Sequence, residues 1–270
     1  MQETRNEKQE ARDEKQIAVK QEAGLPSTID FEADAGSGFE NLVEKSVTLP
    51  ILKLLQNGSA EAKKRDPKYV TGAEPGMLYN TVTGKLYDGE KGVQVIPCFL
   101  DFEYQEWADF GTGSGRPEKI YPAESKILDE TTKDAQNRDR LPNGNYIQTA
   151  AQWFVIVSDA KGSETVMMSF YGTQLPVSRK WNAAQLSISL DGKKGPYTPA
   201  RYSHIWKLST IAKSGKGNTW YVYKYELAHK LDSVKDANLY NRAKQFKANC
   251  EARTKNRKEL LERLAFGDVD

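Results

Sequence analysis

Residues 204–227 read HIWKLSTIAKSGKGNTWYVYKYEL, and this stretch decides the fold. Two runs rich in aromatic and β-branched residues, 204–210 and 219–227, flank the turn Ser214-Gly215-Lys216-Gly217. Runs of this kind on either side of a glycine-containing turn predict a β-hairpin. The most C-terminal strand signals of the chain therefore belong to one antiparallel pair.

Two further segments repeat this pattern. Residues 153–157 and 166–170 flank a turn at 159–162, and residues 79–87 turn near Thr83-Gly84. Residues 93–100 read as a buried strand with an edge or a bulge at Pro97. Short strands with glycine-rich turns between them favour a small barrel or a sandwich over alternating βαβ units. We therefore predict a mainly β fold.

The composition sets the domain organisation. Of the 270 residues, 38% are apolar with tyrosine included and 28% are charged, so the apolar share is below that of an average globular domain. We expect one β domain at residues 39–232 with polar extensions. Residues 1–38 are predicted to be disordered or loosely helical. Residues 233–270 are predicted to form a basic helix with a short acidic tail, because Leu239, Ala243, Phe246 and Cys250 recur at helical spacing.

Several classes of protein are excluded. No stretch approaches the roughly 18 apolar residues that span a bilayer, and the first 23 residues lack the apolar run of a signal peptide. The two cysteines, Cys98 and Cys250, form neither a CxxC nor a disulfide framework. We expect a soluble cytoplasmic protein without a cofactor.

Catalytic motifs are scarce. The sequence has two histidines, His204 and His229, and no GxSxG nucleophile motif. The sharpest enzyme alternative is a Mg²⁺-dependent nuclease that uses a carboxylate cluster. Asp101 and Glu103 of this cluster would share one strand face. Its members are Asp101, Glu103, Glu106 and Asp109, with Glu124-Ser125-Lys126 downstream. Charged residues beside a strand more often form its solvated side, so this is our second alternative.

The charge is unevenly distributed. The formal net charge is +2, but residues 161–263 have 20 Lys and Arg against 8 Asp and Glu, whereas residues 1–160 have 19 against 27. Such asymmetry favours a basic surface for a polyanion. The competing interpretation is that acidic and basic surfaces face each other within the fold.

The basic region also holds aromatic residues, and single-stranded nucleic acid is bound by cations together with ring faces. Tyr221, Tyr223 and Tyr225 share one face of the predicted strand 219–227, and the Arg-Lys-Trp run at 179–181 is expected to be exposed. The predicted nucleic-acid contacts are Arg179, Lys180, Trp181, Lys207, Lys213, Lys216, Tyr221, Tyr223 and Lys224.

One face of the strand 219–227 must line the core. Lys224 and Glu226 share the face of Trp220, which indicates that this face is the wetter one. On this ground the tyrosines alternatively belong to the core, where aromatic residues on strands commonly lie.

The C-terminal segment carries a second signal. Phe266 lies among Asp268, Asp270 and the terminal carboxylate, which suits docking into a basic-rimmed pocket of a partner. A frayed helix end is the equal alternative. A further interpretation is a protein-protein interaction module, host-takeover or structural in role, in which the basic helix 236–264 pairs with an acidic protein.

Five segments together resemble a family. LPILKLLQ (49–56), GAEPGMLYNTVTGKLYDG (72–89) followed by VIPC (95–98), LPVSRKWN (175–182) and YSHIWKLST (202–210) resemble a group of tailed-phage single-stranded DNA-binding proteins of replication or recombination. The resemblance spans roughly residues 40–247. It implies an OB-fold core and an acidic C-terminal tail that contacts replication partners, although the tail of this chain has only two aspartates.

These observations predict a single-stranded DNA-binding protein that acts without catalysis in the cytoplasm of the infected host cell. Its fold would be an OB-like barrel with a basic C-terminal helix. Its partners would be single-stranded DNA and, through the tail, replication or recombination proteins, with no membrane. The sequence leaves homo-oligomerisation and the preference for DNA or RNA open.

Overall fold

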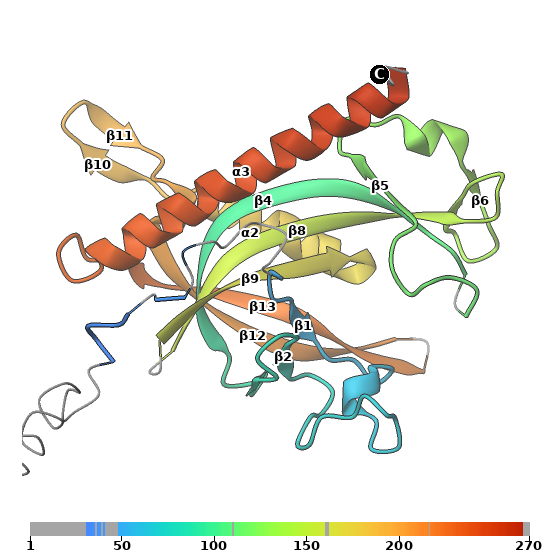
Figure 1. Cartoon of the computed structure of the whole chain (residues 1–270), viewed down its shortest axis with the longest axis horizontal. Helices are drawn as coiled ribbons and strands as arrows, with labels where there is room; N and C mark the ends of the chain where they lie inside the picture. Colours follow the sequence, from blue (N-terminus) through green and yellow to red (C-terminus); the bar gives the residue numbers. More distant parts are fainter. Residues whose placement is uncertain are drawn as a thin grey trace, which may run out of the picture. The chain divides into compact units, whose positions relative to one another are not determined.

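Five antiparallel strands form the central sheet of the computed structural model (Figure 1). Their order is β9 (Gly162–Tyr171), β8 (Tyr146–Asp159), β4 (Val93–Trp107), β12 (His204–Gly215) and β13 (Asn218–Lys230). The sheet curls into a half-barrel. The register between β4 and β8 shifts between Pro97 and Phe99, so the irregularity predicted at Pro97 is a bulge. Bulges bend a strand and increase its twist, which helps this sheet to curl.

The structure describes residues 31–35, 37–38, 40, 48–109, 111–159, 162–215 and 217–266, with side chains up to Asn256. Residues 49–270 belong to one unit and residues 1–48 to another. Of the predicted polar extension, residues 31–35 and 37–38 form turns, and the remainder lies outside the described residues.

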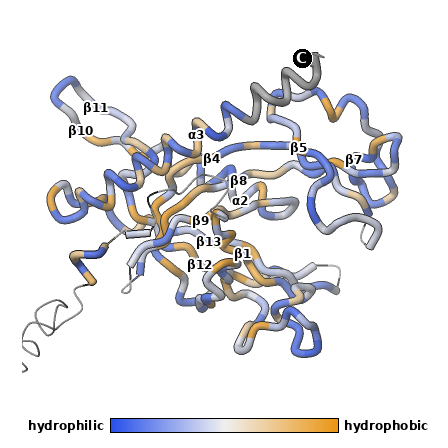
Figure 2. Tube along the Cα trace, in the orientation of Figure 1, coloured by the Kyte–Doolittle hydropathy of each residue, from blue (hydrophilic) through white to orange (hydrophobic). Residues whose placement is uncertain are grey.

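The inner face of the half-barrel packs against two smaller elements. These are the helix α2 (Leu175–Leu186) and a three-stranded sheet of β1 (Leu52–Leu54), β2 (Leu78–Asn80) and β3 (Leu86–Tyr87). Alternate residues of the long strands supply this core. Its members include Leu52, Leu78, Val95, Trp153, Val155, Phe170, Trp181, Trp206, Leu208 and Tyr223. Figure 2 shows that β8 is hydrophobic along much of its length.

The outer face of the sheet is covered by α3 (Ala237–Phe266) (Figure 1). Ala243 is buried against a second cluster that contains Ile96, Cys98, Ile156 and Ile205. Leu239, Tyr240 and Phe246 pack against the same cluster, which explains the helical spacing of the apolar residues after 236. The inner and outer faces of the sheet thus have separate cores.

Hydrogen bonds from two glutamines cover part of the edge of β13. Gln56 accepts from the Tyr221 N–H at 2.9 Å and donates to the Tyr221 carbonyl at 2.9 Å. Gln174 donates to the same carbonyl at 2.8 Å and accepts from the Tyr223 N–H at 3.1 Å. At the opposite edge, Ile51 forms a parallel bridge with Met167 of β9. Side chains therefore satisfy backbone groups that an edge strand leaves unpaired.

The connection from β4 to β8 has a small hydrophobic core of its own. It contains β5 (Lys119–Pro122), β6 (Thr132–Lys133) and β7 (Asp139–Arg140), which extend the sheet. Ile127, Leu141 and Ile147 form its core. The remaining hairpin, β10 (Leu190–Gly192) with β11 (Gly195–Tyr197), follows α2.

The structure confirms the mainly β fold, the three predicted hairpins and the basic C-terminal helix. The sequence patterns did not predict α2. No helix in the described part of the chain is long and apolar enough to cross a membrane.

Candidate nucleic-acid interface

The register of β12 with β13 gathers three of the predicted lysines on the outer face. Lys213 pairs with Trp220, Ser209 with Lys224, and Lys207 with Glu226. Cross-strand partners point to the same side of a sheet, and all three lysines are exposed. We call Lys207, Lys213, Lys224 and Trp220 the hairpin face. Lys216, the fourth predicted lysine of this region, lies outside the described residues.

Trp220 supplies the aromatic surface of the hairpin face. The side chain is half-buried. A Cβ at Gly215 would lie 3.3 Å from the Trp220 ring, so the ring lies against the backbone of the opposite strand where no side chain intervenes. From the sequence, base stacking is instead assigned to the rings of Trp181, Tyr221 and Tyr223. The signal for Trp220 was its alternation with Lys224 and Glu226 on the wetter face.

The tyrosines of β13 occupy the inner face, as the alternative interpretation predicted. Tyr223 is 3% exposed and its hydroxyl donates to the Leu52 carbonyl at 3.3 Å. Burial raises the pKa of Tyr223. Tyr221 packs against the same core, and a Cβ at Gly76 would lie 2.6 Å from its ring. The prediction of Tyr223 as a base-stacking contact is wrong because its ring is enclosed, and Tyr221 lies on the core side as well.

The expected exposure of Trp181 is also wrong. The side chain is fully buried, and its ring lies 4.3 Å from Trp153 and 5.9 Å from Tyr225 in stacked arrangements. On α2, Trp181 shares its buried side with Ser178 and Gln185, at helical spacing. That spacing was the signal that the prediction missed.

Arg179 and Lys180 are exposed, as predicted. They lie on α2, which packs against the inner face of the sheet, whereas the hairpin face belongs to its outer face. The structure therefore does not bring the Arg-Lys-Trp run together with Lys207, Lys213 and Lys224 in one groove.

Charge on the hairpin face is predominantly positive. Among the described residues of β12 and β13, Glu226 is the one carboxylate on this side of the sheet. It forms an ion pair with Lys224, with 2.5 Å between Nζ and Oε1. The hydrogen bond from Lys224 and the charge of Lys207 lower the pKa of Glu226. Glu226 thus stays ionised and offsets one of three lysines.

A second set of exposed cations was not nominated from the sequence. It lies on the loop that begins at the edge of β13, where Asn57 donates to the Thr219 carbonyl at 2.8 Å. None of these cations has an ion-pair partner among the described residues. The set consists of Lys63, Lys64, Arg65 and Lys68.

The predicted carboxylate cluster is divided between the two faces of β4. Asp101 and Glu103 share the outer face, where Thr254 of α3 donates to Asp101 at 3.3 Å and Gln152 donates to Glu103 at 2.9 Å. Glu106 faces the other way and accepts from Asn145 at 2.7 Å and Tyr121 at 2.7 Å. Although burial opposes it, these hydrogen bonds lower the pKa of Glu106.

Asp109, the fourth member, pairs with Arg138 at 3.2 Å and Arg140 at 3.0 Å. No group of three or more histidine, cysteine, aspartate or glutamate side chains in the described part of the chain is arranged to hold a metal ion. The four carboxylates therefore do not converge in the way that the nuclease alternative requires.

Phe266 is the last residue of α3, and its side chain lies outside the described residues together with Asp268 and Asp270. The prediction of a partner-binding tail stays a prediction.

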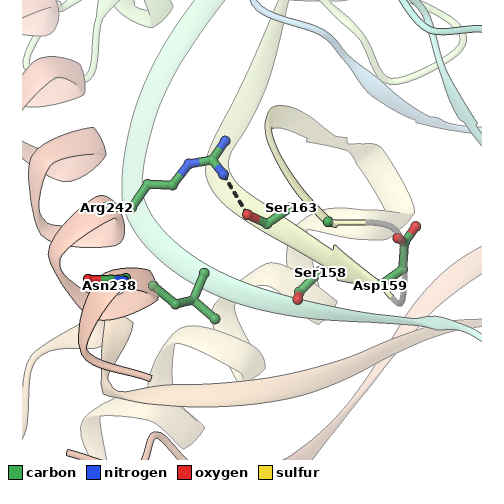
Figure 3. Close-up of a pocket in the computed structure, with 7 residues that line it drawn as sticks. Ser158, Asp159, Ser163, Asn238 and Arg242 are labelled. Carbon is green, nitrogen blue, oxygen red and sulfur yellow. Dashed lines mark hydrogen bonds between the residues drawn. The ribbon is translucent and has the colours of Figure 1, made fainter. Parts of the chain in front are cut away.

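A cavity of about 360 Å³ lies between the start of α3 and the turn from β8 to β9 (Figure 3). Arg242 reaches from α3 to β9, where its Nη1 donates to Ser163 Oγ at 2.5 Å. Ser158, Asp159 and Asn238 complete the polar part of the wall. Asp159 pairs with Lys85.

Comparison with known proteins adds one finding. The model of the Pam3 phage gp34-like protein family matches residues 18–256. The chain belongs to this family. The match covers β1 to β13 and most of α3. No curated protein and no solved structure matches the chain.

Proposed function

We propose that this gp34-like protein binds single-stranded DNA without catalysis, and that the hairpin face is the primary contact. The observation that carries the proposal is the register of β12 and β13, which places three exposed lysines and Trp220 on one strand face. Cations along the backbone path together with an aromatic ring are the features that single strands require.

The strand order supports an OB-type assignment, which is part of this proposal. An OB-fold is a five-stranded, partly open barrel that binds oligonucleotides through its second and third strands and its connecting loops. Here β4, β8 and β9 form a meander, α2 follows, and β12 returns to pair with β4 before β13. The β12–β13 hairpin then corresponds to the last pair of barrel strands, so the hairpin face lies beside one of the connecting loops and not on the second and third strands.

The burial of Trp181 and Tyr223 changes the expected mechanism. With one ring on the hairpin face instead of several, phosphate contacts contribute most of the affinity. Each neutralised phosphate of a single strand adds about −0.7 to the slope of log K against log salt. We expect sequence-tolerant binding that weakens steeply with salt. The biological setting that we propose is phage replication or recombination.

Fluorescence anisotropy with labelled oligo-dT at several salt concentrations tests the proposal. The triple variant Lys207→Gln/Lys213→Gln/Lys224→Gln should lose affinity and flatten the salt slope by about 0.7 for each phosphate contact removed. Lys193→Gln/Lys194→Gln is the control, because these exposed lysines lie in the β10–β11 turn away from the hairpin face. No binding of oligo-dT by the unmodified chain at low salt overturns the proposal. Equal loss in both variants overturns the location of the site.

A further inference from the structure

A polar row continues from the hairpin face across the outer face of the sheet. Lys207 of β12 pairs with Gln94 of β4, Gln94 with Ser158 of β8, and Ser158 with Ser163 of β9. Because directly paired residues share a face, these four side chains form one line. Three strand spacings of about 4.8 Å make the row about 14 Å wide.

The row is open to solvent. Lys207 and Gln94 are exposed, and the two serines are half-buried. The next residues along the same face, Ile96 and Ile156, are buried in the cluster under α3. The row therefore runs along the border of the region that α3 covers.

Arg242 lies at the far end of the row. Its Nη1 donates to Ser163 Oγ at 2.5 Å, and Figure 3 shows the guanidinium extending from α3 over the cavity of about 360 Å³. Arginine, serine and asparagine side chains are among the groups that contact phosphate oxygens, and here Ser158, Ser163 and Asn238 line the cavity with Arg242 and Asp159. The hydrogen bond to Ser163 holds the guanidinium in place before a ligand arrives.

The charges along the row favour an anion. Lys207 and Arg242 are the charged residues at its two ends, and the side chains of Gln94, Ser158 and Ser163 between them are neutral. Two carboxylates lie at the ends. Glu226 is paired with Lys224, and Asp159, which lines the Arg242 cavity, is paired with Lys85. Each is held by a lysine outside the row.

We infer that a single strand bound to the hairpin face continues across Gln94 to the Arg242 cavity, and that this cavity binds a phosphodiester of the strand. The inference rests on the proposed function and adds a second contact site to it. The same chemistry would accept a free phosphate, so the experiment includes both sources.

The decisive comparison uses oligonucleotides of about 4 and about 16 nucleotides, the two ends of the range that one OB-type domain binds. A short oligomer needs only the hairpin face, whereas a long one reaches Arg242. We expect Arg242→Gln to weaken binding of the long oligomer about three- to tenfold and to reduce its salt slope by about 0.7, with the short oligomer unchanged.

Lys244→Gln is the matched control, because Lys244 is an exposed cation two residues from Arg242 on the same helix and does not line the cavity. Its affinities for both oligomers should equal those of the unmodified chain. A parallel titration with inorganic phosphate, followed by NMR of the Ser163 and Arg242 signals, distinguishes the two sources of phosphate.

Four outcomes overturn the inference. They are unchanged long-oligomer binding by Arg242→Gln, equal weakening of both lengths, equal effects of Arg242→Gln and Lys244→Gln, and a response to inorganic phosphate without any length-dependent loss. In each of these the hairpin-face variants can still reduce oligo-dT binding, which leaves the proposed function intact. Failure of the unmodified chain to bind either oligomer removes the proposed function and the inference together.

Discussion

The indole rings of Trp181 and Trp153 stack with centroids 4.3 Å apart and an interplanar angle of 26°. This contact joins α2 to the inner face of β8, and Trp153 Nε1 donates to Ser178 Oγ at 2.8 Å in the same place. Phe170 and Trp206 also lie against Trp181. The helix is thus anchored through one aromatic side chain at the centre of the inner core.

Replacement of this anchor should destabilise the fold. Trp181→Ala removes a fully buried indole, and such substitutions cost about 3–5 kcal/mol in the free energy of unfolding. Urea denaturation followed by circular dichroism measures the change. Arg179→Ala/Lys180→Ala, on the exposed side of the same helix, should stay within about 0.5 kcal/mol for each substitution. Similar costs for the two variants would contradict the buried position of Trp181.

Trp220 should matter for binding more than for stability. If its ring stacks on a base, Trp220→Ala loses about 1–3 kcal/mol of affinity for oligo-dT, and Trp220→Phe retains most of it. Anisotropy titrations at fixed salt give these values, and thermal unfolding confirms that both variants are folded. An affinity of Trp220→Ala equal to that of the unmodified chain would remove the ring from the site.

The glutamine contacts at the edge of β13 should protect its backbone. Gln56→Ala leaves the Tyr221 N–H without its partner, and unmade hydrogen bonds of this kind cost about 1–3 kcal/mol. Amide exchange at Tyr221 should accelerate, as measured by NMR or mass spectrometry. Asn57→Ala breaks an exposed bond to Thr219 and should change the free energy of unfolding by less than about 0.5 kcal/mol. Unaltered exchange at Tyr221 in Gln56→Ala would argue against this contact.

Both cysteines should be inert in the folded protein. Burial raises the pKa of Cys98 and of Cys250 to about 12, so at pH 8 almost none of either thiol is the reactive thiolate. A thiol-specific chromogenic reagent should react slowly with the native chain and rapidly with two thiols after denaturation. Rapid modification of the native chain would show that the contact between β4 and α3 opens readily.

Local patterns were sufficient for the three hairpins, for the strand at 93–100 and for α3, but not for β5, β6, β7, β10 and β11. Hairpins at 79–87, 153–170 and 204–227 follow from alternating side chains and glycine turns, which depend on neighbours in the sequence. The sequence does not predict the helix α2, because two of its three buried residues are polar and its apolar periodicity is therefore weak. These residues are Ser178, Trp181 and Gln185. Which side of α2 is buried depends on the aromatic residues of the sheet that pack against Trp181.

The candidate site likewise depends partly on local sequence patterns and partly on tertiary packing. Alternation along residues 220–226 was enough to group Trp220 with Lys224 and Glu226 and to set the tyrosines apart from them. Only the pairing of four strands placed Gln94, Ser158 and Ser163 in line with Lys207. The docking of α3 then brought Arg242 to the end of that line.

The sequence by itself determined which residues alternate and where the chain turns, because these properties depend on adjacent residues. The tertiary structure alone decided which alternating face was buried and which distant side chains met, because burial depends on the segments that pack against each strand.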